Sequence, residues 1–88
     1  MKYLTGYKKN GYDFVLAERK GDVMRAKGFN GTTFNHEVFH VQSHDGRTIQ
    51  GKEFPPAEFA PSNNEWGKKG WTFLTEEAAK QHFEKLTQ

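Results

Sequence analysis

Turn-forming dipeptides divide most of this sequence into short segments, and they constrain the fold more than any other feature. Asn10-Gly11 and Asp45-Gly46 are typical of tight β-hairpin turns, and Lys20-Gly21-Asp22 marks a further reversal. Many of the segments between them are rich in β-branched and aromatic residues, which favour strands. Asp45-Gly46 is expected to join the predicted strand 33–43 to the predicted strand 47–54. The predicted strands are 3–9, 12–19, 23–27, 33–43, 47–54 and 71–73.

The C-terminal segment has the pattern of an amphipathic helix. Thr75 can cap the helix with its hydroxyl group, and two glutamates follow in the first turn, where the helix dipole favours negative charge. Ala79, Phe83 and Leu86 recur at the spacing of one apolar helix face. We therefore expect residues 1–88 to form one α+β domain. It would combine a four- to five-stranded, mainly antiparallel sheet with the 75–87 helix packed on one face.

The length of the chain limits the size of its core. An 88-residue chain of 10.2 kDa is expected to expose roughly 5,300 Å² when folded, against about 14,800 Å² when unfolded. Aromatic residues make up 15% of the chain and include 8 Phe, so a thin core must consist largely of aromatic rings. Such a core leaves little room for a large internal active-site cavity.

Composition also excludes several classes of site. The sequence contains no Cys, which excludes disulfides, thiolate zinc sites and cysteine nucleophiles. No apolar run approaches the ~18 residues that span a bilayer, and residues 1–6 lack the apolar region of a signal peptide. We therefore expect a cytoplasmic protein that contacts no membrane and uses no cofactor.

Residues 36–40 read His-Glu-Val-Phe-His and match the H-E-x-x-H motif of zinc proteases. That chemistry requires a helix, which brings His36 and His40 to one ion and positions Glu37 as the general base. On a strand, the two histidines would lie about 13 Å apart. Val38 and Phe39 favour a strand, so no metal site is favoured. A minimal zinc hydrolase that uses His36, Glu37 and His40 is kept as an alternative.

The histidines as a set carry no further catalytic pattern. Each would titrate near neutral pH when unperturbed. No Ser/His/Asp arrangement has the positional signature of a catalytic triad. We therefore expect these side chains to be exposed and to have no catalytic role. They are His36, His40, His44 and His82.

Charge is distributed unevenly along the chain. Residues 1–28 carry seven bases and three acids, whereas residues 29–88 carry six bases and eight acids. The bases near the N-terminus alternate with tyrosines, a combination that suits stacking on unpaired bases and neutralising phosphates. A solvated face of exposed strands is the simpler explanation, and lysines also protect strand edges from unwanted pairing. The candidate nucleic-acid-binding residues are Lys2, Tyr7, Lys8, Lys9, Tyr12, Arg19 and Lys20.

Residues 55–70 are expected to form a long connection rich in Pro, Asn and Gly. Connections of this length are often functional, and tryptophans in loops are frequent anchors of protein interfaces. Closure of a thin core is the alternative role, which we expect for Trp71 and Phe73 and leave open for Trp66. The candidate protein-binding residues are Phe59, Trp66, Lys68 and Lys69.

Three segments within residues 36–86, a span of a little over half of the chain, carry a family resemblance. They are residues 37–41 (Glu-Val-Phe-His-Val), residues 60–73, which contain P-S-N-x-E-W-G-x-x-G-W-x-F, and residues 75–78 (Thr-Glu-Glu-Ala). In this respect the chain resembles a group of small uncharacterised proteins from phages and prophages. The resemblance implies an origin in a mobile element, an α+β fold and a strand over 38–41. It implies no activity.

These observations support three hypotheses about function. The favoured one is a non-enzymatic accessory protein of a phage or mobile element that binds a macromolecule of the host or phage, with a protein as the favoured partner. The first alternative is binding of single-stranded DNA or RNA through the basic N-terminal hairpin. The second is the zinc hydrolase. The sequence does not distinguish a monomer from a homodimer.

Overall fold

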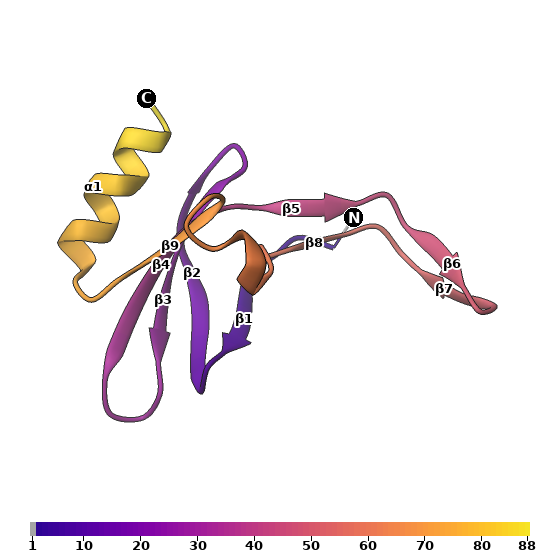
Figure 1. Cartoon of the computed structure of the whole chain (residues 1–88), viewed down its shortest axis with the longest axis horizontal. Coiled ribbons are helices and arrows are strands. Elements are labelled where there is room, and N and C mark those ends of the chain that lie inside the picture. The colour runs from indigo at the N-terminus through magenta and orange to yellow at the C-terminus, as the bar shows by residue number, and fades with distance from the viewer. Residues whose placement is uncertain (1) are drawn as a thin grey trace.

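The computed structural model describes residues 2–88, and these form the predicted α+β fold (Figure 1). Met1, which the predicted domain 1–88 includes, lies outside the described residues. Five antiparallel strands make one sheet in the order β1-β2-β3-β4-β9, and helix α1 lies on one of its faces. The strands are β1 (Gly6–Lys9), β2 (Tyr12–Lys20), β3 (Val23–Phe29), β4 (Phe34–His40) and β9 (Gly70–Phe73).

The first four strands form a meander, because each is joined to the next by a tight turn. Asn10 and Gly11 both have positive φ, at 52° and 84°, which matches the twist of the β1–β2 hairpin. The β3–β4 turn is held by Asn30, whose side-chain oxygen accepts hydrogen bonds from the backbone N–H groups of Thr32 and Thr33. The predicted hairpin at Asn10-Gly11 is therefore confirmed.

The prediction that residues 47–54 form one strand returning from Asp45-Gly46 is wrong. The chain instead reverses at Gln50-Gly51, where φ is 52° and 78°. Residues 42–59 therefore form a two-stranded arm between β4 and β9, paired within itself and not with the main sheet. Its strands are β5 (Gln42–His44), β6 (Arg47–Ile49), β7 (Lys52–Phe54) and β8 (Ala57–Phe59).

The arm has two parts, which we call its root and its tip. The root is the β5–β8 pair, and the tip is the β6–β7 pair. Between them, residues 45–46 lie opposite Pro55-Pro56, and the ladder is interrupted because proline has no N–H group to donate. The expected loop over 55–70 is thus partly structured, since it contains β8 and the short 3₁₀ helix η1 (Asn63–Glu65).

Helix α1 (Glu76–Leu86) has the predicted cap and buries the predicted face. The Thr75 hydroxyl accepts a hydrogen bond from the backbone N–H of Ala78. Ala79 and Phe83 are buried with two sheet residues, Val23 and Val38. This packing covers part of one face of the sheet. Among residues 2–88, no helix is long and apolar enough to cross a membrane.

The opposite face of the sheet holds a second, largely aromatic core. Phe14, Met24 and Phe39 are buried there together with Ala26. Helix α1 does not cover this face. Instead, residues from the N-terminal segment, from β1 and from the 60–69 connection pack against the cluster. They are Leu4, Tyr7, Tyr12, Val41, Ala60 and Trp66.

Two histidines lie between the sheet and α1. His36 on β4 is 4% exposed, and the other three histidines are half-buried, so the expectation that the histidines are exposed is wrong. The ring of His82 lies 4.6 Å from that of Trp71 and 5.3 Å from that of Phe73, between centroids. Within residues 2–88, His36 Nδ1 and His82 Nε2 are buried without a hydrogen-bond partner. Burial lowers the pKa of both imidazoles, because it disfavours their charged form.

We expect the free energy of unfolding to decrease as the pH falls below about 6.5, the ordinary pKa of histidine. His36 and His82 have lowered pKa values in the folded state, so the unfolded chain takes up these protons first and is stabilised by acid. Their effect is absent above about pH 6.5 and grows until the pH reaches the lowered folded-state values. Urea unfolding between about pH 5 and pH 8 measures this dependence.

The double variant H36Q/H82Q is the matched control for this measurement. It keeps polar side chains at both positions but removes both titrations. Its stability should therefore change less over the same pH range. An unchanged slope in the variant would show that other groups cause the acid sensitivity.

Candidate functional site

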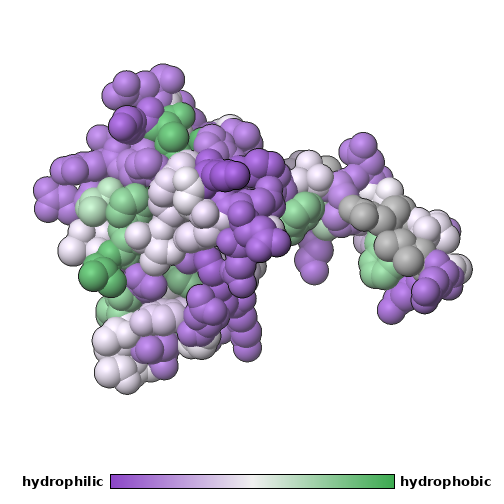
Figure 2. Space-filling view, viewed as in Figure 1, coloured by the Kyte–Doolittle hydropathy of each residue, from purple (hydrophilic) through white to green (hydrophobic). Residues whose placement is uncertain are grey.

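The arm is the most prominent surface feature of the molecule. It projects from one side of the sheet, and Figure 2 shows it as a separate lobe at the right of the body. The radius of gyration is 13.8 Å, against about 12 Å for a compact chain of this length. Phe54 at the tip and Phe59 at the root are 40% and 42% exposed, respectively. The arm therefore presents two aromatic side chains away from both cores.

The root of the arm is fixed to the body by Glu58 on β8. Its carboxylate accepts hydrogen bonds from the two terminal guanidinium nitrogens of Arg19, at 2.5 and 2.8 Å, and from the backbone N–H of Leu4. The hydrogen bonds from Arg19 are the main cause that lowers the pKa of Glu58 to about 2. Backbone hydrogen bonds also join Lys2 to Pro56 and Glu58. The direction of the arm root is thus set by the N-terminal segment and by the end of β2.

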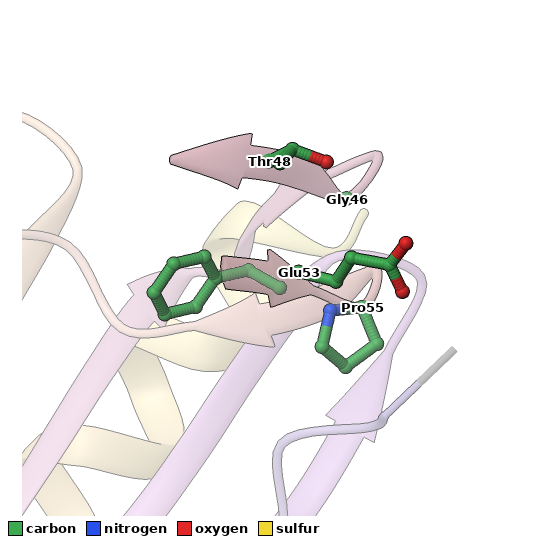
Figure 3. Close-up of a pocket in the computed structure, with 5 residues that line it drawn as sticks. Gly46, Thr48, Glu53 and Pro55 are labelled. Carbon is green, nitrogen blue, oxygen red and sulfur yellow. The ribbon is translucent and has the colours of Figure 1, made fainter. Parts of the chain in front are cut away.

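The tip of the arm carries a groove of about 560 Å³. Figure 3 shows Gly46 and Thr48 on one side of it and Glu53 and Pro55 on the other, and Phe54 also lines it. A hydroxyl, a carboxylate and two apolar rings can together receive a polar or apolar side chain from a partner.

The predicted protein-binding residues do not form one surface. Phe59 belongs to the arm, whereas Trp66 packs against the second core, with its ring centroid 6.2 Å from that of Phe39. Trp66 Nε1 donates to Thr72 Oγ1 at 2.8 Å. A Cβ atom at residue 70 would lie 2.4 Å from the indole, so the close approach of this ring requires Gly70. Trp66 is therefore integrated into the body.

The other two predicted protein-binding residues, Lys68 and Lys69, lie in the turn before β9. Both Lys68 and Lys69 are exposed. The Lys69 ammonium lies 2.9 Å from the Glu65 carboxylate, one helical turn earlier. Neither lysine lies on the arm.

A buried carboxylate organises the surroundings of Trp66. Glu37 on β4 is 2% exposed and accepts hydrogen bonds from Tyr7 Oη at 2.6 Å, Lys9 Nζ at 3.0 Å and Thr72 Oγ1 at 3.0 Å. The Lys9 ammonium also lies 3.2 Å from the centroid of the Trp66 ring, in a cation–π contact. Burial and the bond to Glu37 raise the pKa of Tyr7, so this phenol remains protonated. We call these five side chains the Glu37 network.

The predicted nucleic-acid-binding residues are mostly engaged within the protein. Tyr7 and Lys9 belong to the Glu37 network, and Arg19 binds Glu58. The Lys8 ammonium lies 3.8 Å from Asp13, and the Tyr12 hydroxyl is 3.0 Å from that of Thr33. The two remaining residues, Lys2 and Lys20, are exposed. Pairing with acids reduces the positive charge that this group can present to phosphates.

The H-E-x-x-H segment lies on strand β4, as expected, and not on a helix. Strand geometry separates His36 and His40 by about 13 Å along the same face. Glu37 points to the opposite face, into its own network. The residues that the zinc hydrolase would use therefore do not meet at one ion. Within residues 2–88, no group of three or more His, Asp or Glu side chains is arranged to hold a metal.

Sequence reasoning missed Phe54 as a surface residue, because it placed residues 47–54 in the sheet. The signal that could have revealed the arm is Gln50-Gly51, a dipeptide that can turn, followed by Pro55-Pro56. It also missed the exposed aromatic pair Phe29 and Phe34 at the end of the β3–β4 hairpin.

Comparison with known proteins adds no relative. No family model, curated protein or solved structure matches this chain. The resemblance to phage and prophage proteins therefore stays a prediction. The functional inference rests on the geometry of the arm and of the body that carries it.

We expect W66A to destabilise the protein by about 3 kcal/mol, because it removes an aromatic ring from the second core and leaves a cavity. Thermal unfolding followed by circular dichroism measures the change. The matched control is L74A, since Leu74 is 86% exposed and its truncation should alter stability by less than about 0.5 kcal/mol. If W66A had the same melting temperature as the wild type, Trp66 would again be a candidate contact residue.

Proposed function

We propose that this chain is a non-enzymatic binding protein that engages a protein partner through its arm. The observation that carries the proposal is the exposure of Phe54 and Phe59 on an element that lies outside both cores. An isolated two-stranded hairpin is only marginally stable in water, so a projecting one gains stability when a partner covers it. Aromatic side chains of this kind are frequent anchors in protein interfaces.

The charge of the arm favours a protein over a nucleic acid. Residues 42–59 contain two bases and three acids, so the arm is close to neutral and slightly negative. Binding to nucleic acid depends on lysine and arginine side chains that neutralise phosphates. The groove at the tip contributes the carboxylate of Glu53, which would repel a phosphate. A protein surface with apolar and basic side chains fits these properties better.

The resemblance described above supports a role as an accessory protein of a phage or mobile element. In that setting, a small chain without catalytic groups acts by occupying a surface of a larger protein in the cytoplasm. The body then serves to present the arm. The ion pair between Arg19 and Glu58 and the backbone bonds to Lys2 hold the arm root in one direction before binding. Such preorganisation reduces the entropy lost on association.

The proposal predicts that an affinity pull-down from bacterial lysate captures a discrete protein that survives nuclease treatment. The double variant F54A/F59A should reduce this capture at least about tenfold, because it removes both aromatic anchors. The control L74A truncates an apolar residue that is even more exposed but lies off the arm, and it should bind normally. Mass spectrometry identifies the captured protein, and thermal unfolding verifies that each variant folds.

Recovery of nucleic acid alone would contradict the proposal. In that case the co-purifying proteins would disappear after nuclease treatment, and the affinity would decrease steeply with salt concentration. Capture that is equal for the wild type and F54A/F59A would also contradict it, because the contact would then lie elsewhere on the body.

A further inference from the structure

Helix α1 is held on the sheet by a small set of side chains. Its buried residues are Ala79 and Phe83, and Leu86 is partly buried beside them. The link that joins β9 to the helix, residues 74–75, is exposed (Figure 1). Within residues 2–88, the strands are hydrogen-bonded to one another and have no backbone bond to α1. Detachment of the helix would therefore break side-chain contacts and leave the pairing of the strands intact.

Two imidazole rings lie in this contact region. His36 is on the same face of β4 as Val38, because side chains alternate along a strand, and the ring of His82 packs on β9. Both rings have one nitrogen that is buried without a partner in the described structure. Protonation makes both nitrogens of an imidazole donors, so it would leave a buried N–H group without an acceptor. The docked helix therefore accommodates the neutral rings better than the charged ones.

The charged groups that face His36 give little support to a proton there. Arg25 and Lys27 of β3 disfavour the imidazolium, whereas Glu76 of α1 favours it. The Glu76 carboxylate is already shared, because it lies 3.2 Å from the Lys80 ammonium and 4.0 Å from both cations of β3. Burial remains the largest influence on His36.

The groups that face His82 also disfavour its protonation. They are Lys85 of α1 and His40 of β4, and β9 contributes the two aromatic rings against which His82 packs. His40 Nδ1 lies 3.8 Å from the exposed carboxylate of Asp22. A proton on His82 would thus combine the cost of burial with repulsion from its neighbours.

The opposite face of the sheet has no comparable arrangement among the described residues. The second core is formed by apolar and aromatic side chains, and the Glu37 network consists of a carboxylate, a phenol, an ammonium, a hydroxyl and an indole. The described contacts of both involve no histidine. Acidification to about pH 5, which protonates ordinary histidines, therefore acts mainly on the face that carries α1.

We propose that α1 is an acid-released element, which docks on the sheet over His36 and His82 at neutral pH and detaches on acidification while the strands and the second core stay folded. Detachment gives both rings to water, where they take up protons more readily than in the docked state. Each proton bound therefore favours the detached form. Release uncovers Val23 and Val38, and the freed segment loses its helix, because an isolated helix of 11 residues is marginal in water.

Hydrogen exchange of the full chain, followed by mass spectrometry at about pH 7.5 and about pH 5, tests the proposal. The rates are corrected for the chemical exchange rate at each pH. We expect the protection of amides in α1 to decrease at least about fivefold more than that of amides in β2 and β3. The reason is that opening of the helix alone exposes the two imidazoles.

Three variants assign the effect to the two rings. H36Q/H82Q removes both titrations, so the protection of α1 should be similar at the two pH values. H44Q is the matched control, because His44 lies on the arm root, and it should respond like the wild type. If the double variant does not fold, H82Q replaces it, since His82 is only half-buried and its loss should make the decrease less steep.

Several outcomes would overturn the proposal. Equal loss of protection in α1 and in the sheet would show that acid unfolds the whole molecule. Unchanged protection of α1, or its absence already at about pH 7.5, would show that the neutral rings do not control docking. A decrease that persists in H36Q/H82Q would assign the effect to other groups. The proposed function is independent of these results, because none of residues 42–59 belongs to the core beneath α1.

Discussion

The buried carboxylate of Glu37 is the interaction on which the rest of the molecule depends. Three strand spacings separate β1 from β4, about 14 Å in a flat sheet, yet Tyr7 on β1 donates directly to Glu37 on β4. The sheet must therefore curl to satisfy this group. Thr72 on β9 reaches the same carboxylate from the other side. A carboxylate left alone at this position would be strongly destabilising, so its partners hold both edges of the sheet toward its centre.

This curl explains how so short a chain builds two cores. The curled face is closed by Trp66 and by aromatic side chains of the sheet itself, and it therefore needs no second helix. Helix α1 is free to cover part of the other face. Residues 42–59 form an insertion between two neighbouring strands, β4 and β9, and none of them belongs to either described core.

Local sequence signals correctly predicted the elements that are specified by residues close together in the chain. Asn10-Gly11 has the backbone preferences of its turn, and the Thr75 cap and the stripe of Ala79 and Phe83 describe α1 without reference to other segments. The Gln50-Gly51 turn of the arm is also a local signal, but Asp45-Gly46 is the stronger turn sequence, so the prediction placed residues 47–54 in one sheet strand. In the candidate site, Phe59 was proposed from its place in the 55–70 connection; it is exposed on the arm, and its role in binding stays a prediction. Trp66 was left open, because only its contacts with Lys9 and Thr72 distinguish an anchor of the body from a contact residue.

The sequence by itself determined the class of fold, the position of the helix and the strand character of the H-E-x-x-H segment, because turns, caps and periodicity act over a few residues. Tertiary structure alone decided which side chains remain available to a partner. Lys2 and Lys9 both belong to the basic N-terminal part of the sequence. Lys9 nevertheless pairs with Glu37, 28 residues away, whereas Lys2 is exposed. Exposure depends on contacts between distant segments, and no local pattern encodes these contacts.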